Sequence, residues 1–317
     1  MKTILITGGL GQIGTELSTY LRRAYGTNHV IVTDVVRKDS PVVEEGPFEQ
    51  LDVTDGKRLA ELVDRYHVDT VMHLAALLSA VAEAHPQAAY HINLDGLFQV
   101  LEVAREKKLA VFTPSSIGAF GASTPKVTPQ DTIQRPSTMY GVTKVAGELL
   151  CDYYFRRFGV DTRGVRFPGL ISYAALPGGG TTDYAVDIYY AALKTGHYDC
   201  PIAAGTLMDM MYIPDALRAV HELMEADPTR LTHRNAFNIA AMSFAPEDIA
   251  AAIQKELPSF TMSYQVNPIL QAIADSWPDK LDDTAAREEW GWKAQYDLQT
   301  MTKDMLQNLR PRLVETK

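Results

Sequence analysis

Hydrophobic positions follow two different periods along the first half of the chain, and each period predicts a different element. Short runs of consecutive apolar residues, rich in β-branched types, are typical of strands buried on both faces. Between them, apolar residues recur every three or four positions, as on one face of a helix. The expected strands are Lys2–Thr7, Val30–Thr33, Thr70–Leu74, Ala110–Pro114 and Thr162–Arg166, and the expected helices are Gln12–Tyr25, Lys57–Tyr66, Ala88–Lys107 and Tyr140–Phe158.

This alternation predicts an α/β protein with a Rossmann-like, doubly wound parallel sheet, covered by helices on both faces. The pattern changes after Phe167, where prolines and the run Gly178–Gly180 predict loops. Beyond that point we expect helices over Asp183–Lys194, Pro214–Ala226 and Pro246–Glu256, and a strand over Asn235–Ile239.

The change of pattern predicts two structural units. Residues 1–166 are expected to form the domain of the parallel sheet, with residues 213–240 returning to it. Residues 167–212 and 241–317 are expected to form a smaller C-terminal α/β lobe. We expect this lobe to bind a substrate, because open α/β sheets bind ligands at the carboxyl edge that it would cover.

Three glycines follow the first expected strand at intervals of three residues. Gly8, Gly11 and Gly14 lie between this strand and the first expected helix. Glycines allow a tight turn and let the backbone approach a pyrophosphate, which the N–H groups of the helix N-terminus then bind. The turn therefore predicts a dinucleotide site that includes Gln12 and Ile13, with an ordinary βα turn as the alternative.

Acidic residues after the second and third strands bear on the choice of dinucleotide. Asp34 ends the second strand, where a carboxylate accepts hydrogen bonds from the ribose hydroxyls and repels a 2′-phosphate. This favours NAD over NADP, although the nearby Arg37 weakens the preference, and Asp34 as a turn residue is the alternative. Asp52 and Val53 are expected to border the adenine, unless Asp52 only caps a helix.

A tyrosine and a lysine spaced for one helix face are the candidate catalytic pair. Tyr140 and Lys144 lie one turn apart on an expected helix. A free tyrosine has a pKa of about 10, and a nearby ammonium favours the phenolate, which can then act as a base. Ser115 and Ser116 follow an expected strand at the carboxyl edge, and Asn93 can support the helix geometry and a proton-relay water.

Together these motifs resemble the extended branch of the short-chain dehydrogenase/reductase family, in order and in spacing. The matching segments are Thr7–Gly14, His73–Ala76, Asn93, Ser115–Ser116, Tyr140–Lys144 and Arg166–Pro168. The resemblance implies a Rossmann-like fold and NAD as cofactor. It further implies that Leu74, Ala75 and Ala76 line the nicotinamide ribose, that Lys144 also binds this ribose, and that Ser116, in preference to Ser115, is the catalytic hydroxyl.

The second half of the chain resembles the L-threonine 3-dehydrogenases within this family. The similar segments are Leu170–Ala185, Met210–Ala216, Asn238–Phe244 and Ile273–Pro278. The resemblance implies NAD-dependent oxidation of the β-hydroxyl of L-threonine to 2-amino-3-oxobutanoate, with Tyr140 as the base.

The polar groups expected around such a substrate are compact. The N–H groups of Gly180, Thr181 and Thr182 and the two threonine hydroxyls can bind its carboxylate. Asp183 either offers negative charge to the ammonium or caps the following helix, and we favour the cap. Ser79 is a further candidate contact. Trp277 is a candidate core or lid residue, and because a lone tryptophan is usually packing, it is left outside the expected site.

Other functions remain open at this point. The first alternative is a nucleotide-sugar 4-epimerase, but Leu207–Tyr212 offers no arginine for a diphosphate. A non-catalytic redox sensor that binds NAD is the second, and it has no need of Ser116, Tyr140 and Lys144. An enzyme acting on another small β-hydroxy acid or amino alcohol is the third.

The amino-acid composition of the chain limits the kinds of molecule that it is expected to bind. The formal net charge is −9 and there is no Lys/Arg cluster, which argues against nucleic acid and anionic membranes. No segment has the length and apolarity of a membrane span, and no His/Cys/Asp/Glu cluster has the spacing of a metal site. We expect a cytoplasmic enzyme of small molecules. Resemblance to the family further implies a homodimer joined through helices Ala88–Lys107 and Tyr140–Phe158.

Overall fold

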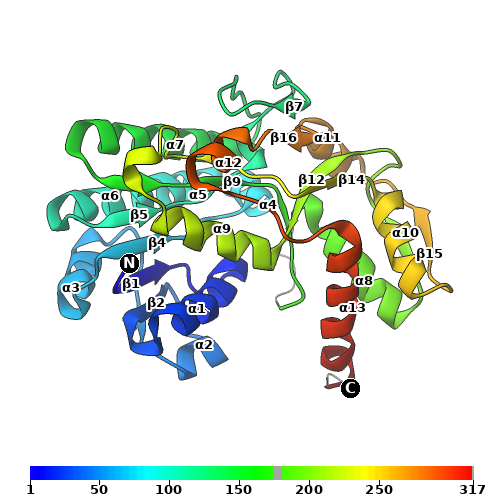
Figure 1. Cartoon of the computed structure of the whole chain (residues 1–317), viewed down its shortest axis with the longest axis horizontal. Helices are drawn as coiled ribbons and strands as arrows, with labels where there is room; N and C mark the ends of the chain where they lie inside the picture. The colour runs from blue at the N-terminus through cyan, green and yellow to red at the C-terminus, as the bar shows by residue number, and fades with distance from the viewer. Residues whose placement is uncertain (175–179, 316–317) are drawn as a thin grey trace.

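Six parallel strands form the central sheet, in the order β3-β2-β1-β4-β5-β8 (Figure 1). They are β1 (Ile4–Thr7), β2 (Val30–Asp34), β3 (Phe48–Gln50), β4 (Thr70–His73), β5 (Ala110–Phe112) and β8 (Asp161–Arg163). This order reverses direction between β1 and β4, as in Rossmann folds. The computed structural model describes residues 1–174 and 180–315, and it confirms the expected fold class.

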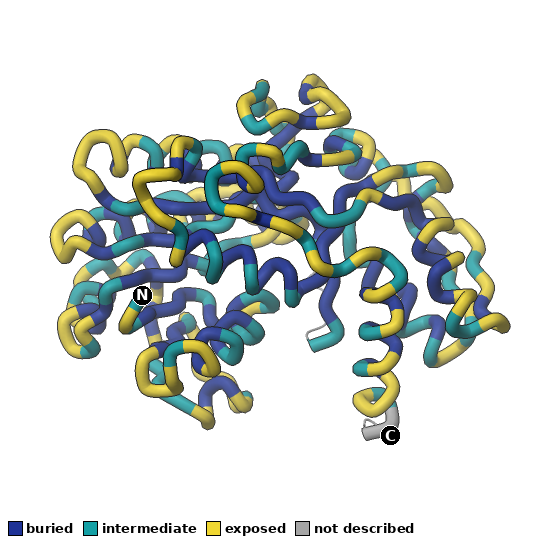
Figure 2. The backbone as a smooth tube through the Cα atoms, viewed as in Figure 1, coloured by how far each residue is buried: buried dark blue, intermediate teal, exposed yellow. Residues whose placement is uncertain are grey.

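Successive residues of β1 point to opposite faces of the sheet, and each face has its own helical layer. Ile4 and Ile6 belong to the apolar cluster that includes α1 (Gln12–Tyr25) and α9 (Ile213–Glu225). Leu5 belongs to the cluster on the other face, formed with α3 (Gly56–Tyr66), α6 (Gly96–Lys107) and α7 (Met139–Phe158). Figure 2 shows this two-faced burial as a continuous dark-blue interior along the strands.

The expected strand Thr162–Arg166 is in fact two strands. β8 ends at Arg163, and β9 (Val165–Phe167) joins a second parallel sheet with β6 (Ser115–Ser116) and β13 (Phe237–Asn238). The break falls at Gly164, where a Cβ atom would lie 2.5 Å from the carbonyl oxygen of Thr113. The single-strand prediction was wrong because this close backbone approach, which only glycine allows, is not visible in hydrophobic periodicity.

The expected helix Ala88–Lys107 contains a wider turn. It consists of α5 (Pro86–Tyr90), a π-helical turn over His91–Asp95, and α6. π-Turns are rare and are often found at functional sites. The inserted turn carries Asn93, whose side chain is buried.

The second half of the chain builds a smaller lobe at the carboxyl edge of the central sheet, on the right in Figure 1. Its strands are β10 (Gly169–Ile171), β12 (Met208–Tyr212) and β14 (Met242–Phe244), with the pair β11 (His197–Cys200) and β15 (Thr261–Tyr264). A further pair joins β16 (Lys280–Leu281) to β7 (Val127–Thr128), which comes from the first half of the chain. Its helices are α8 (Tyr184–Lys194), α10 (Pro246–Glu256), α11 (Pro268–Asp275) and α13 (Leu298–Glu315), whereas α12 (Thr284–Trp290) packs against β13 of the second sheet.

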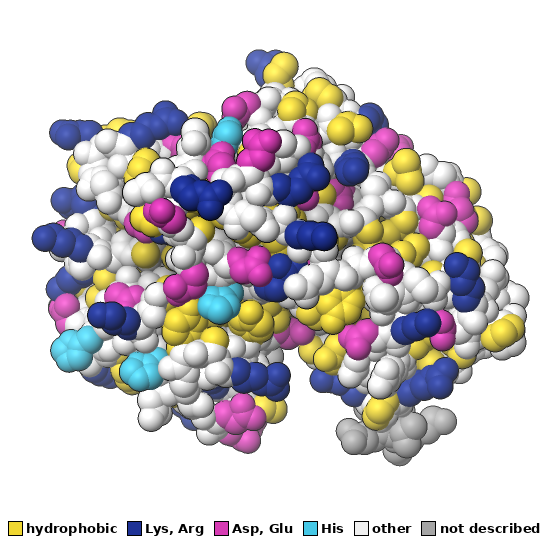
Figure 3. Space-filling model, viewed as in Figure 1, with side chains coloured by type: hydrophobic (Ala, Val, Ile, Leu, Met, Phe, Trp, Pro, Cys, Tyr) yellow, Lys and Arg dark blue, Asp and Glu magenta, His cyan; other side chains and the backbone are white. Residues whose placement is uncertain are grey.

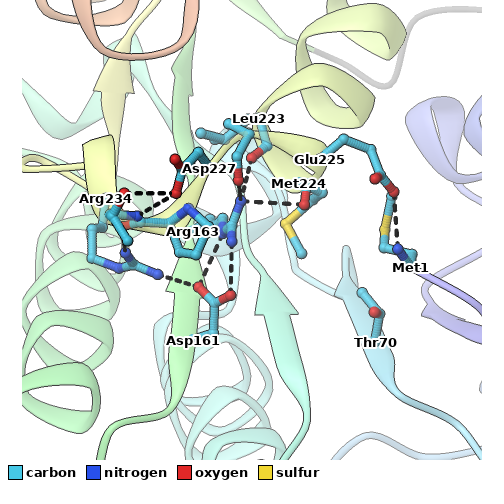
Figure 4. A network of polar contacts seen from close by, with 12 residues as sticks. Met1, Thr70, Asp161, Arg163, Leu223, Met224, Glu225, Asp227 and Arg234 are labelled. Atoms are coloured by element: carbon cyan, nitrogen blue, oxygen red, sulfur yellow. Dashed lines mark hydrogen bonds and ion pairs between the residues drawn. The ribbon is translucent and has the colours of Figure 1, made fainter.

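Helix α9 is fastened to the central sheet by buried polar contacts (Figure 4). Arg163, on β8, donates hydrogen bonds to the carbonyl oxygens of Leu223, Met224 and Ala226 at the C-terminus of α9. These carbonyls lie at the C-terminal end of the helix, where few have a partner within the helix and where a cation is favourable for the helix dipole. These contacts hold α9 against the central sheet. The division of the chain into two domains stays a prediction.

A buried carboxylate fixes the C-terminal segment to this lobe. Asp209, on β12, is 1% exposed, and one of its oxygens accepts a hydrogen bond from Leu281 N at 2.8 Å. Its other oxygen has no hydrogen-bond partner in the structure. Burial raises the pKa of Asp209 to about 7, so the neutral form is favoured in the folded protein.

We expect this group to make stability depend on pH. Because the folded pKa lies above the unfolded value, Asp209 contributes stability at low pH that is lost as the pH rises from about 4 to about 7. Asp209→Asn should remove this loss, which is on the order of 1 kcal/mol per pH unit within that window. Thermal unfolding of both proteins from pH 4 to 8 tests it, with the exposed Asp39→Asn as control. Parallel curves would contradict the assignment.

The distribution of charged side chains on the surface agrees with the lack of a Lys/Arg cluster in the sequence. On the face shown in Figure 3, Lys and Arg side chains alternate with Asp and Glu, and neither sign gathers over a large area. Among the described residues, no helix has the length and apolarity needed to cross a membrane.

Candidate active site

A cleft opens where β1, β4 and β6 end, between the central sheet and the smaller lobe. Most of the residues that the sequence singles out line it together. They are Gly8, Gly11, Gln12, Ile13, Gly14, Leu74, Ala76, Ser79, Ser116, Tyr140, Lys144, Gly180, Thr181 and Thr182. The candidate cofactor, catalytic and substrate residues thus share one cavity.

The glycine turn is tightly packed against its own backbone. Gly8 has a φ of +64°, and a Cβ atom there would lie 2.7 Å from the backbone of Ala75. A Cβ on Gly14 would lie 2.4 Å from the carbonyl oxygen of Gly8. The backbone therefore faces the cleft without side chains in between, and the N-terminus of α1 adjoins it. This cradle fits the pyrophosphate of a dinucleotide.

Asp34 supports the glycine turn from the end of β2. Its Oδ2 accepts a hydrogen bond from Leu10 N at 3.0 Å, and its Oδ1 accepts one from Val35 N at 2.9 Å. Both oxygens retain lone pairs for a further donor, such as a ribose hydroxyl. Asp34 itself does not line the cleft.

The structure places Asp52 and Val53 away from the cleft lining. Asp52 Oδ1 accepts hydrogen bonds from the N–H and the hydroxyl of Thr54, at 2.9 and 2.7 Å, and these bonds lower the pKa of its carboxyl. Val53 is buried, and its side chain is so close to Gly96 that a Cβ there would lie 2.7 Å away. Contact of Asp52 and Val53 with the cofactor stays a prediction.

Asn93 anchors the loop that follows β4. Its Oδ1 accepts from Leu77 N at 2.8 Å, and its Nδ2 donates to Leu77 O and to Thr143 Oγ1, each at 3.1 Å. Asn93 and Ala75 border a smaller cavity behind Lys144. Asn93 therefore holds the loop against α7, and the structure shows it as a support of the cleft.

Tyr140 and Lys144 share a face of α7, as the spacing predicts. The helix begins with Thr138 as its N-cap, whose side chain accepts from Gly141 N. Lys144 Nζ lies 5.4 Å from the centre of the Tyr140 ring and donates to Pro114 O at 2.7 Å. The ammonium is thus held beside the phenol by a backbone carbonyl, which does not neutralise its charge.

Gly118 brings Ser116 next to the tyrosine. A Cβ on this glycine would lie 3.3 Å from two carbons of the Tyr140 ring and 3.5 Å from Ser116 Oγ, so both side chains adjoin it. Ser115, by contrast, donates its hydroxyl proton to the buried carboxylate of Glu148. A hydroxyl whose proton is already donated is poorly placed to hold a substrate oxygen, which favours Ser116 for that role.

The neighbouring histidine adds no charge. His73 is buried, and its Nδ1 forms a hydrogen bond with Thr7 Oγ1 at 3.0 Å. Burial, followed by the positive charge of Lys144, lowers the pKa of His73 to about 3. The imidazole is therefore neutral at physiological pH, and the positive charge near Tyr140 is that of Lys144.

The expected carboxylate-binding segment lies across the cleft as a 3-10 turn, Thr181–Asp183, at the start of α8. Gly180 N already donates to Asp183 Oδ2, at 2.6 Å. The prediction that this N–H binds substrate conflicts with that bond, because Asp183 closes the turn in the manner of a capping box. Thr181 and Thr182 remain candidates. Residues 175–179 of the expected loop lie outside the described residues.

Trp277 lines the cleft, although the sequence argument leaves it outside the site as a core or lid residue. Leu78, Ile117 and Phe167–Leu170 also line it without having been predicted. A single tryptophan carries no periodic signal, and its position depends on pairing between segments far apart in sequence. Lys126 Nζ fixes it by donating to Trp277 O at 3.1 Å.

Among residues 1–174 and 180–315, no group of three or more His, Cys, Asp or Glu is arranged to hold a metal ion.

Comparison with known proteins identifies the family of the chain. A profile of the NAD dependent epimerase/dehydratase family matches residues 4–240. The chain belongs to this family. The family's NAD dependence agrees with the open glycine cradle, and the expected resemblance to the extended short-chain dehydrogenases is confirmed.

Three relatives illustrate the similarity. An uncharacterized epimerase/dehydratase of Staphylococcus aureus is 59% identical over 97% of this chain and 96% of its own length. The solved structure of L-threonine dehydrogenase from Clostridium difficile is 60% identical, with a TM-score of 0.97 over 98% of both chains. A monomeric L-threonine 3-dehydrogenase of metagenomic origin is 40% identical, with a TM-score of 0.93 over 98% of this chain and 99% of its own.

Proposed function

We propose that this member of the family oxidises the β-hydroxyl of L-threonine to 2-amino-3-oxobutanoate, with NAD as the oxidant. The observation that carries the proposal is the meeting of Tyr140, Ser116 and Lys144 in the cleft that also contains the glycine turn. The similarity to L-threonine dehydrogenases of solved structure supports the choice of substrate.

The proposed roles follow from the geometry. Ser116 donates a hydrogen bond to the β-oxygen of threonine and holds it beside the Tyr140 hydroxyl. Tyr140, as phenolate, accepts the proton of that hydroxyl, and the ammonium of Lys144 beside the ring compensates the negative charge. Bound NAD supplies the hydride acceptor. The glycine turn, with Gln12, Ile13, Leu74 and Ala76, would hold the cofactor in place.

Substrate specificity is assigned to the opposite wall of the cleft. The hydroxyls of Thr181 and Thr182 and the N–H groups of their turn would bind the carboxylate of threonine, and Ser79 would add a polar contact. All three residues line the cleft. A site of small polar groups suits an amino acid better than a nucleotide diphosphate, which needs cationic partners.

The first test is NADH formation, followed by absorbance, with purified protein, NAD and L-threonine. Parallel reactions with D-threonine, L-serine and UDP-galactose define the selectivity. We expect rapid NADH production with L-threonine alone. Interconversion of UDP-galactose and UDP-glucose without net NADH would instead make the protein a nucleotide-sugar 4-epimerase, and binding of NAD without any turnover would make it a sensor.

We also propose a homodimer that forms through α6 and α7, which pack side by side. Several large apolar side chains of this pair remain exposed, namely Phe98, Val142, Leu149, Tyr153, Phe155 and Phe158. Large exposed apolar side chains concentrated on two neighbouring helices are typical of protein interfaces. One similar enzyme is monomeric, so the state of this chain needs its own measurement.

Light scattering after gel filtration tests the dimer. Leu149 is 64% exposed, and we expect Leu149→Glu to turn a dimer into a monomer because it places a charge in the apolar contact. Lys255→Glu, on the distant helix α10, is the control. A wild-type protein that elutes as a monomer would refute the proposal.

A further inference from the structure

The catalytic helix carries a third polar residue in register with Tyr140 and Lys144. Glu148 lies one further turn along α7, so residues 140, 144 and 148 share one helix face. Its side chain is 9% exposed and does not line the cleft. No step of the proposed reaction uses it.

All contacts of the Glu148 carboxylate are with donors from other segments. Oε1 accepts from the Ser115 hydroxyl and from Arg166 Nε at 3.1 Å. Oε2 accepts from Arg166 Nη2 at 2.8 Å and from Gln134 Nε2 at 2.9 Å. Four donors on one buried carboxylate make a fully satisfied network, which favours a single arrangement of the segments that it joins.

Arg166 extends the network into the second sheet. It lies on β9, is 6% exposed, and donates through Nη1 to Gln130 O at 2.9 Å and to Asn238 Oδ1 at 3.0 Å. Its guanidinium lies over the ring of Phe120, 5.2 Å from the centre. The charge of Glu148 is thus balanced by a cation that is itself fixed on several sides.

The network attaches α7 to β6 immediately beside the reacting groups. Lys144 bonds to the carbonyl of Pro114, Glu148 bonds to the hydroxyl of Ser115, and the next residue is Ser116. Pro114, just before β6, and Ser115, its first residue, are therefore tied to two successive turns of the helix. Because Tyr140 belongs to the same helix, these ties set the distance between Tyr140 and Ser116.

We propose that Glu148 is a positioning residue, which holds Ser116 and Tyr140 in reactive register through its hydrogen bond to Ser115. This inference rests on the proposed function. Displacement of a reacting group by about 1 Å can reduce a rate by about 100-fold, so a small shift of β6 relative to α7 should be measurable in kcat. The cofactor site, built from the turns after β1 and β4, should not change.

The test compares Ser115→Ala, Glu148→Gln and the double variant in the full-length protein. We expect Ser115→Ala to lower kcat for L-threonine about tenfold, with the Kd for NAD unchanged. Since Glu148 acts on Ser116 through Ser115, both substitutions act on the same link. The double variant should therefore be no slower than the slower single variant, a non-additivity that double-mutant cycles detect. Ser115→Ala removes a single hydroxyl, so it still tests the proposal if Glu148→Gln fails to fold.

The control removes a comparable buried hydroxyl far from the site. Thr302 Oγ1, in α13, bonds to the hydroxyl of Tyr189 at 2.8 Å, and Thr302→Val should lower the melting temperature without lowering kcat. If Ser115→Ala behaves in the same way, or if the two substitutions multiply in their effects on kcat, positioning by Glu148 is refuted. If the wild-type protein makes no NADH from L-threonine, the proposed function is refuted together with the role of Glu148. If the wild-type protein turns over L-threonine normally, only the proposed role of Glu148 is refuted.

Discussion

Tyr140→Phe is expected to reduce L-threonine oxidation by on the order of 10³-fold or more, because it removes the group that we propose as acceptor of the substrate proton. The phenol lines the cleft beside Lys144, and no other side chain in the described lining lies in the same relation to that ammonium. Phenylalanine keeps the ring and its contact with Gly118, so the fold and the cofactor site should persist.

Separate measurements of binding and turnover decide this prediction. NAD affinity, followed by quenching of tryptophan fluorescence, should remain within about twofold of the wild type, while kcat falls, as when an interaction made in the transition state is lost. Tyr153→Phe, at an exposed tyrosine of the same helix, is the matched control and should retain full activity. Turnover by Tyr140→Phe near the wild-type rate would exclude Tyr140 as the base.

The parts of the site that sequence reasoning could predict are those encoded by local spacing. Gly8, Gly11 and Gly14 follow a strand directly, and Tyr140 and Lys144 lie one helical turn apart, so short-range geometry suffices to place each set. Parallel strands then bring both sets to the same edge of the sheet. The convergence in one cleft thus follows from fold class and motif position together.

The parts that could not be predicted depend on contacts between distant segments. Trp277 reaches the cleft because β16 pairs with β7, about 150 residues earlier in the chain. The link from Ser115 to Glu148 and Arg166 joins three elements that periodicity treats separately. Likewise, the bond from Gly180 N to Asp183 uses a donor that the sequence argument had reserved for substrate.

The limits of periodicity also explain the errors in element boundaries. The break between β8 and β9 and the π-turn around Asn93 leave the apolar pattern almost unchanged, yet both shape the site. β9 carries Arg166 to Glu148, and the π-turn directs Asn93 towards the loop after β4. The geometry of the site therefore depends on irregular backbone positions, which hydrophobic periodicity does not detect.

Gly14→Ala is expected to weaken NAD binding by about 100-fold. The added Cβ would lie 2.4 Å from Gly8 O, 2.7 Å from Gly9 Cα and 2.8 Å from Gly9 C. All three atoms are backbone, so no side chain can move aside, and the start of α1 must shift away from the turn. Loss of two hydrogen bonds from the helix N-terminus to a pyrophosphate, at roughly 1.5 kcal/mol each, corresponds to about that factor in Kd.

A second glycine at the start of a helix provides the control, because it separates a loss of NAD binding at the glycine turn from the general effect of a Gly→Ala substitution. A Cβ on Gly56, the first residue of α3, would lie 2.2 Å from Gln99 Oε1, the movable end of a flexible side chain. Gly56→Ala should therefore leave NAD affinity unchanged in isothermal titration calorimetry. If Gly14→Ala bound NAD as tightly as the wild type, the turn would not be in close contact with the cofactor. The proposed position of threonine beside Tyr140 would then lose its support, because the position of the nicotinamide in the cleft depends on where the pyrophosphate is held.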